Sequence, residues 1–566
     1  MNTELFLSGK NVVDINANYD YELANVRRQL SALIENQFNR ELILKKYPQG
    51  ERLLSAHDEG SIYIHDLSKI LLQPYCYSFS VLPLVREGIK FSDSFCSLPA
   101  RRLDTFIAHL REFSSHAAIR TRGAVGFADL CACLTYYVKR EHLLETTEGQ
   151  RFFKQKLQSF FYSLNENLRE GSEAMFSNLN FFDRYYIESV YDDYFDILDI
   201  DAEDIMNVQK CILKWHTEEI LTRKVLRFPI ITVVFNLDQS NVVKDNDFLE
   251  FVASENMKHT MYNFLLQRGL DAIASCCRLI SQTSSHFLNS YGSGGVSIGS
   301  HQVVSLNLPH IYLSSPKDFK ERLLESLELV IDFLSWHRNL LWEHRHLDSL
   351  SESGYRSVNR MFSTLGLIGF WDLLQVADMS WEEGEKFIKD FVRVVDSYRQ
   401  FMNIELVPAE TAAYTLFDKD KAKFSHPHYS QVQMYSNQVD ALWSASSFGE
   451  RIKNSGRISK YFSGGSMTFI SMQSFFTSFE QVSNLVKRIG RFGVPYFTFD
   501  TQINSCKSGH STLGEVLKCP LCGAKINQKF RRIVGYFVNV NKFHERKERD
   551  LPFRKNISQE EAFLSA

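Results

Sequence analysis

The sequence lacks the marks of a secreted or membrane-spanning protein. Its first twenty residues hold no apolar core behind a basic start, as a secretory signal peptide would. No uninterrupted apolar run approaches the roughly 18–20 residues that a membrane-spanning helix requires. The ten cysteines are too sparse among 566 residues for a disulfide scaffold. These absences predict a cytoplasmic protein that has no membrane partner.

The sequence also has no excess of charge of either sign. Its 64 Lys and Arg residues nearly balance its 67 Asp and Glu residues, which leaves a net charge of −3. This balance argues against a general polyanion-binding surface, so we expect no direct nucleic-acid binding. P-loop, GxGxxG and GxSxG motifs are absent, and the glycine-rich residues 290–300 lack the lysine of a phosphate-binding loop.

What is present is a long chain without internal boundaries. No Pro/Gly/Ser-rich linker and no repeat interrupts it, so we expect one continuous core. Residues 21–47 and 320–345 carry apolar side chains at helical spacing. Residues 228–237 and 301–313 are short, apolar and β-branched, which predicts buried strands. Short buried strands that alternate with helices indicate an α/β fold.

A cysteine cluster near the C-terminal end is typical of a metal site. Cys519 and Cys522 form a CxxC pair followed by Gly523, and Cys506 lies 13 residues before Cys519. With His510 these residues make a Cys3His set suited to tetrahedral zinc. The alternatives are a reduced pair without metal or a redox CxxC. Because the ligands sit in one compact knuckle, we expect a structural rather than a catalytic ion.

Gly535 interrupts a segment that otherwise predicts a buried strand, RRIVGYF. Glycine weakens a strand interior because it adds backbone entropy and contributes no side chain to the packing. From the residues alone, a bulge or a close backbone approach explains it.

Two further groups of cysteines stand apart from the metal cluster. Cys276 and Cys277 are adjacent, which disfavours a relaxed disulfide between them and leaves at least one free thiol. Such thiols are commonly inert small hydrophobes, and core packing is also the simplest interpretation of Cys131 and Cys133. Cys76, in QPYCYSFS, is equally ambiguous from the residues alone.

Taken together, the chain resembles the anaerobic (class III) ribonucleotide reductases, members of the glycyl radical enzymes. The resemblance rests on the order and number of matching segments along nearly the whole chain. They are VDINANYD (13–20), AHDEGSIYIHDLS (56–68), QPYCYSFS (73–80), QSFFYSLNENLREGSEAMFSNLNF (158–181), SCCRL (275–279), VVSLNLPH (303–310), LGLIGF (365–370), MNIELVPAETAAY (402–414), FSGGSM (462–467) and RRIVGYF (531–537).

The resemblance implies a fold and a division of the chain. The family fold is a ten-stranded α/β barrel in which a cysteine loop and a glycine loop meet inside. We expect residues 1–500 to form this catalytic barrel with a helical N-terminal part, 501–528 the zinc knuckle, and 529–566 the glycyl radical loop and tail.

The resemblance also implies a radical mechanism. Gly535 would store a backbone radical, which draws a hydrogen atom from Cys277. The resulting thiyl would take the 3′-hydrogen of the ribose so that the 2′-hydroxyl leaves as water. Cys76 would donate hydrogen from the other face of the sugar. Asn307 would hold the substrate hydroxyls or formate, although a strand-end cap remains an alternative role for this buried amide.

Cofactors and partners follow from the same resemblance. We expect a radical S-adenosylmethionine activase, ribonucleoside triphosphate substrates, dNTP or ATP specificity effectors near the interface of a homodimer, and structural zinc on the Cys3His set. The reductant is formate, or alternatively a thioredoxin-like protein acting with Cys276.

The chain departs from the family pattern at several places. The match begins near residue 16, so the family's N-terminal ATP cone is expected to be missing. Tyr63 replaces a histidine, His310 replaces an arginine, and SIGSHQVVSLNLPH carries extra residues. Residues 543–547 differ after the glycine, and Gly509 stands where a metal ligand is often found, with His510 as its replacement. These differences leave open a glycyl radical enzyme with another substrate, or an inactive nucleotide-binding relative.

Overall fold

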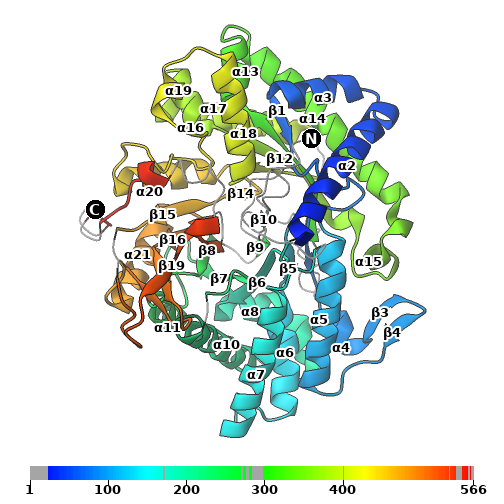
Figure 1. Ribbon diagram of the computed structural model, residues 1–566, viewed down its shortest axis with the longest axis vertical. Helices are drawn as coiled ribbons and strands as arrows, with labels where there is room; N and C mark the ends of the chain where they lie inside the picture. Colours follow the sequence, from blue (N-terminus) through cyan, green and yellow to red (C-terminus); the bar gives the residue numbers. More distant parts are fainter. Residues whose placement is uncertain are drawn as a thin grey trace.

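The computed structural model describes residues 23–169, 173–223, 225–268, 272–275, 279–282, 298–398, 401–473, 475–514, 516–533, 536–542, 551–558 and 561–562. Over these residues helices surround a large sheet (Figure 1). Among them, none of the helices combines the length and the apolar character that crossing a bilayer demands.

Five parallel strands form the first half of the sheet. Each pairs with the next of the five along the chain, and the intervening helices pack on the outside. Strands covered in this way become almost wholly apolar, and all eight residues of β7 are buried. The five are β2 (Cys76–Phe79), β5 (Val125–Phe127), β6 (Ser177–Phe182), β7 (Ile230–Leu237) and β8 (Asn263–Arg268).

A second set of parallel strands completes the barrel: β11 (Ile298–Asn307), β12 (Met361–Ile368), β13 (Met402–Leu406), β14 (Gly465–Ser466), β15 (Thr468–Ser471) and β16 (Tyr496–Asp500). β11 runs antiparallel to β2, and β16 runs antiparallel to β8. The sheet path begins at β14 and ends at β15, which only Met467 separates. Counting this pair as one strand closes a barrel of ten described strands. The predicted ten-stranded α/β barrel is confirmed.

The strand predicted over 301–313 is correct only as far as Asn307. From Leu308 the chain turns into helix α13 (Leu308–Ser314), with Pro309 in its first turn. The Asn307 side chain accepts a hydrogen bond from the His310 N–H and so caps this helix. Asparagine at the cap and proline in the first turn favour a helix start, and these local signals outweigh the β-branched composition. The helix predicted over 320–345 is α14 (Phe319–Glu343).

Two antiparallel hairpins belong to sheets separate from the barrel sheet. β9 (Ala272–Ser275) and β10 (Leu279–Gln282) pair antiparallel, and β9 contacts β6 and β7. Figure 1 shows both strands at the centre of the ring of elements. The second hairpin belongs to a four-stranded sheet of order β18-β17-β19-β20, formed by β17 (Ile503–Cys506), β18 (Ser511–Leu513), β19 (Ile526–Ile533) and β20 (Tyr536–Asn539). The predicted boundary at 528/529 falls inside β19.

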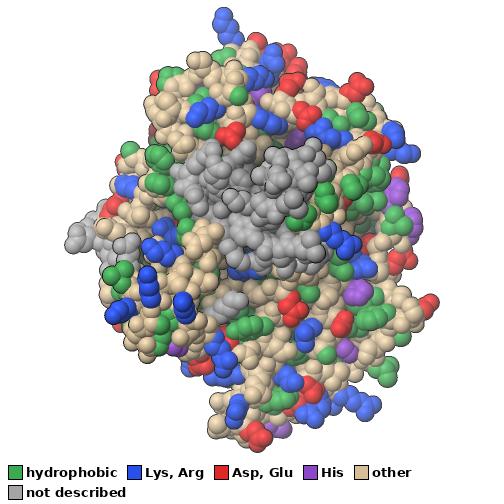
Figure 2. Space-filling view, viewed as in Figure 1, with side chains coloured by type: hydrophobic (Ala, Val, Ile, Leu, Met, Phe, Trp, Pro, Cys, Tyr) green, Lys and Arg blue, Asp and Glu red, His purple; other side chains and the backbone are tan. Residues whose placement is uncertain are grey.

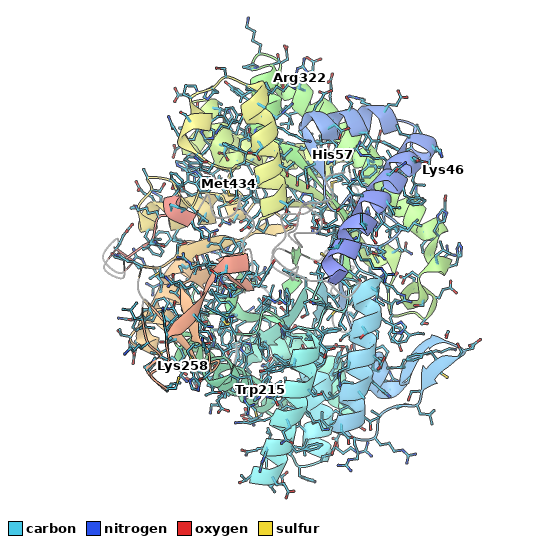
Figure 3. All side chains as sticks on the ribbon, viewed as in Figure 1. Lys46, His57, Trp215, Lys258, Arg322 and Met434 are labelled. Carbon is cyan, nitrogen blue, oxygen red and sulfur yellow. The ribbon has the colours of Figure 1, made fainter. Side chains whose placement is uncertain are left out.

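Apolar side chains fill the layer between the helices and the barrel. In Figure 3 Trp215, from α10 (Ala202–Thr222), lies within the packed lower half, and its ring meets that of Phe161 with centroids 4.9 Å apart. Met434 lies in the other half, where it is also buried. On the face shown in Figure 2, basic and acidic side chains are interspersed, as the near-zero net charge predicts.

Candidate active site

Cys76 is the first residue of β2 and is held in a tight backbone cradle. Its thiol is buried, and the Ala124 N–H donates a hydrogen bond to Sγ at 3.2 Å. A Cβ on Gly123 would lie 2.9 Å from Sγ and 2.7 Å from the Tyr75 carbonyl oxygen. Glycine is therefore required at 123 so that the backbone can approach the sulfur.

Buried cations hold the turn around Cys76. Lys69 Nζ donates to the Arg122 carbonyl at 3.0 Å, and Arg169 donates to the Gly123 carbonyl. Glu173 compensates both cations, at 3.3 Å from Lys69 and 3.7 Å from Arg169. Burial alone would raise the pKa of Glu173, but the charges of Lys69 and Arg169 lower it below its usual value. The carboxylate is therefore ionised at neutral pH and offsets one of the two positive charges.

The extra residues of SIGSHQVVSLNLPH form a bulge beside Cys76. Ser300 pairs with Cys76, and the register of β11 against β12 shifts between Ser300 and Gln302, at His301. The His301 carbonyl accepts hydrogen bonds from the Tyr75 N–H at 3.1 Å and from Arg122 Nη2 at 3.2 Å. The added residue thus joins the cradle through its backbone.

The ring of His301 packs outward, toward helix α14. Its Nδ1 lies 2.9 Å from Nδ1 of His337, and its Nε2 lies 2.8 Å from the Ser363 hydroxyl. Burial lowers the pKa of both histidines, that of His337 to about 3, so both are neutral. His337 Nε2 lies 2.8 Å from the Leu71 carbonyl and must donate to it. Nδ1 of His337 is then the acceptor, and Nδ1 of His301 is the donor.

The predicted thiyl residue Cys277, with Cys276, lies outside the described residues. The described strands on either side of it bound its position. Ser275 pairs with Leu279, so β9 and β10 end side by side where residues 276–278 connect them. This connection belongs to the hairpin that contacts β6 and β7.

The predicted radical residue Gly535 also lies outside the described residues. The described strands on either side of it pair with each other, Ile533 with Tyr536, and Tyr536 is buried. The Tyr536 ring centroid lies 5.3 Å from that of Phe176 and 5.2 Å from that of Phe228.

Arg532 anchors the same hairpin from its other strand. Its guanidinium donates to Asn263 Oδ1 at 3.0 Å and to the Thr260 carbonyl at 2.9 Å. Asn263 begins β8, Phe176 directly precedes β6, and Phe228 lies two residues before β7. The base of the glycine hairpin and Cys76 therefore lie at the same end of the first half-barrel, where its parallel strands start.

The structure does not bring Asn307 to Cys76. Asn307 lies seven residues beyond Ser300 along β11, which corresponds to about 20 Å of extended strand. Its amide donates to the Gly60 carbonyl at 2.9 Å and to Asp420 Oδ2 at 2.8 Å. With the cap on His310, these bonds use the whole side chain, which favours the alternative role of a strand-end cap.

His310, which replaces the family's arginine, is part of this second buried cluster. Its Nδ1 lies 2.5 Å from Asp420 Oδ1, and Asp420 also accepts from the Tyr435 hydroxyl at 2.7 Å. The replacement is thus matched by a buried carboxylate. Asp420 was not predicted from the sequence, since its helix shows nothing but ordinary polar spacing.

The metal cluster is assembled as predicted. The donor atoms of Cys506, His510, Cys519 and Cys522 all lie within 4.8 Å of one another. The Cys506 and Cys522 sulfurs are 3.7 Å apart, and Cys519 Sγ lies 3.7 Å from His510 Nδ1. Zinc–sulfur bonds of about 2.3 Å in a tetrahedron place two sulfurs about 3.8 Å apart, so the set fits zinc. Gly509 is left-handed, with φ of +86°, and a Cβ there would meet the Arg223 carbonyl, so His510 is the residue that would supply the fourth ligand.

Comparison with known proteins agrees with this architecture. The family model described as anaerobic ribonucleoside-triphosphate reductase matches residues 16–556. A solved anaerobic ribonucleotide reductase superposes with a TM-score of 0.82 at 28% identity, covering 94% of this chain and 89% of that one. The Thermotoga maritima anaerobic ribonucleotide reductase in complex with dATP and CTP gives 0.81 at 28% identity, covering 96% and 92%. The same enzyme with glycerol in the active site gives 0.82 at 28%, covering 98% and 93%. No curated protein sequence matches the chain.

Proposed function

We propose a radical route for ribonucleotide reduction by this chain, which belongs to the anaerobic ribonucleoside-triphosphate reductase family. It is an oxidoreductase that replaces the 2′-hydroxyl of a ribonucleoside triphosphate with hydrogen. The observation that carries the route is the shared position of Cys76 and the base of the Gly535 hairpin at one end of the barrel that encloses β9 and β10.

Each predicted residue has one task in this route. A radical stored at Gly535 supplies the hydrogen-abstracting power. Cys277 gives its thiol hydrogen to that site and then takes the 3′-hydrogen of the ribose. The 2′-hydroxyl leaves as water, and Cys76 gives its hydrogen atom to C2′, which leaves a thiyl on Cys76. The reductant returns a hydrogen atom to Cys76 and passes one electron, with a proton, to the oxidised C3′, which then recovers its hydrogen from Cys277. The Ala124 N–H and the lack of a side chain at Gly123 support this role of Cys76, since they fix the direction of its sulfur.

Formate is the reductant that we propose. The net reaction is then ribonucleotide, formate and a proton giving deoxyribonucleotide, carbon dioxide and water. The alternative is a thiol route that uses Cys276, which lies outside the described residues. Among the described cysteines, Cys131 and Cys133 lie in helix α6 (Leu130–Arg140), where burial raises the pKa of both thiols and disfavours disulfide exchange. Asn307, held by Gly60 and Asp420, lends no support to the choice.

The partners follow from the family. We propose activation by a radical S-adenosylmethionine activase, assembly as a homodimer, and regulation by dNTP or ATP at a specificity site. The Thermotoga maritima relative has been solved with dATP in such a site. The Cys3His cluster would hold zinc as a structural ion, and the cytoplasm suits its thiolates because it keeps them reduced.

The test is product formation by the activated enzyme without oxygen. Formate labelled with carbon-13 should yield labelled carbon dioxide and deoxynucleoside triphosphate in equal amounts. Deoxynucleotide formed without labelled carbon dioxide would reject formate as the reductant but not the rest of the route. An activated enzyme that makes no deoxynucleotide from any triphosphate would reject the route.

A further inference from the structure

The C-terminal tail (residues 551–558 and 561–562) packs onto the barrel. Ile557 is buried and forms a parallel bridge with Met472, just after β15. Its N–H donates to the Ser471 carbonyl at 2.7 Å, and its carbonyl accepts from the Gln473 N–H at 2.9 Å. The tail thus joins the barrel sheet through one isolated β-bridge.

One buried carboxylate joins the tail to the glycine hairpin. Asp500 ends β16 and is 1% exposed. Its Oδ2 lies 3.0 Å from Arg531 Nη2 and 3.5 Å from Arg554 Nη1 of the tail. Its Oδ1 accepts from the Arg532 N–H at 3.2 Å. Burial alone would raise the pKa of Asp500, but the charges of Arg531 and Arg554 lower it below its usual value, so it remains an anion.

Arg554 and Asp500 hold both backbone groups of one hairpin residue. Arg554 Nη1 donates to the Arg532 carbonyl at 3.3 Å, while Asp500 accepts from the N–H of the same residue. The described pairing of β17 with β19 stops at Phe530. Beyond that point the side chains of Asp500 and Arg554 bond the backbone N–H and carbonyl of Arg532, as a neighbouring strand would. Arg532 itself is 2% exposed, and only two residues separate it from Gly535.

We propose that the tail is a clamp that holds the β19–β20 hairpin against the barrel, with Asp500 and Arg554 as positioning residues for Gly535. The guanidinium of Arg532 and the packing of Tyr536 also hold the hairpin. The meaning of the clamp for radical storage rests on the proposed function, but the clamp itself does not.

The first test measures hydrogen exchange of residues 526–539 in the unactivated full-length protein. Arg554→Ala removes the bond to the Arg532 carbonyl, and loss of one charge-assisted hydrogen bond corresponds to roughly 10- to 100-fold more frequent opening. Arg554→Lys keeps the charge but not the planar fork, so its hairpin should exchange at a rate between those of the wild type and Arg554→Ala. This variant also serves if Arg554→Ala does not fold.

Lys555→Ala is the matched control. It removes a neighbouring cation that donates to the Ser446 carbonyl at 2.8 Å and does not contact Asp500 in the described structure. Its hairpin should exchange as in the wild type. Equal exchange in wild type and both Arg554 variants would overturn the clamp. So would an equal increase in Lys555→Ala, because the tail would then stabilise the whole fold without selectively holding the hairpin.

The second test measures the lifetime of the glycine radical in activated enzyme under a fixed trace of oxygen. The lifetime should shorten at least several-fold in Arg554→Ala and remain unchanged in Lys555→Ala. An equal lifetime in wild type and Arg554→Ala would reject the role of the clamp in protecting the radical. If the wild type forms no radical at all, the proposed function fails, while the exchange result still decides the clamp.

Discussion

Gly123→Ala tests the cradle of Cys76 most sharply. The added Cβ would lie 2.9 Å from Cys76 Sγ and 2.7 Å from the Tyr75 carbonyl oxygen, where ordinary contacts begin at 3.4 Å. The sulfur or the strand must therefore move by at least 0.5 Å, the difference between 3.4 and 2.9 Å. Since a misplacement of about 1 Å can cost 100-fold in rate, kcat should fall roughly 10- to 100-fold. That loss corresponds to about 1.4–2.7 kcal/mol of barrier.

The assay combines deoxynucleotide formation with electron paramagnetic resonance on the same sample. Radical yield should match the wild type, because Gly123 lies in the Cys76 cradle and not in the Gly535 hairpin. Gly126→Ala is the matched control: Gly126 lies in β5, three residues after Gly123, and its Cβ would lie 2.9 Å from the Ser78 hydroxyl and away from the thiol. An unchanged kcat in Gly123→Ala, or an equal loss in Gly126→Ala, would refute the reasoning.

Three further predictions follow from the site. Cys76→Ser should retain the glycine radical yet lose deoxynucleotide formation by at least about 1,000-fold, because a hydroxyl is a far poorer hydrogen-atom donor; turnover near the wild-type rate would exclude Cys76 as donor. Glu173→Gln should destabilise the fold at pH 7 by about 3–5 kcal/mol, since it leaves Lys69 and Arg169 uncompensated. Because the folded-state pKa of Glu173 is lowered, its contribution is present above the unfolded value near 4.5 and is lost as pH falls through the folded-state pKa. Urea unfolding curves of wild type and Glu173→Gln should therefore converge in acid, and parallel curves would contradict this. Metal analysis should find one zinc per chain, lost in Cys519→Ser together with a lower Tm, whereas a metal-free wild type would remove the zinc assignment.

The parts of the fold that follow from local patterns could be predicted from the sequence. The apolar run that forms β7 and the helical spacing of α14 each determine one element almost alone. The cluster of Cys506, His510 and the CxxC pair could likewise be predicted, because ligands so close in sequence can converge in few other ways. The helix after Asn307 was missed because cap and proline signals outweighed composition.

The parts that depend on distant contacts could not be predicted. Glu173 compensates Lys69, which lies 104 residues away, and Asp500 meets Arg532 and Arg554 from a separate strand. No short pattern marks a carboxylate that is buried only because other segments converge on it. Asn307 shows the same dependence: its segment resembles the family, but the fold places its amide about 20 Å of strand away from the level of Cys76.

The central claim is that the hairpin between Ile533 and Tyr536 stores an unpaired electron. The most direct measurement is electron paramagnetic resonance of protein activated without oxygen, prepared once with ordinary glycine and once with α-deuterated glycine. We expect a doublet that collapses toward a single line on deuteration and is absent in Gly535→Ala. A signal that is insensitive to glycine labelling, or that persists in Gly535→Ala, would contradict the claim.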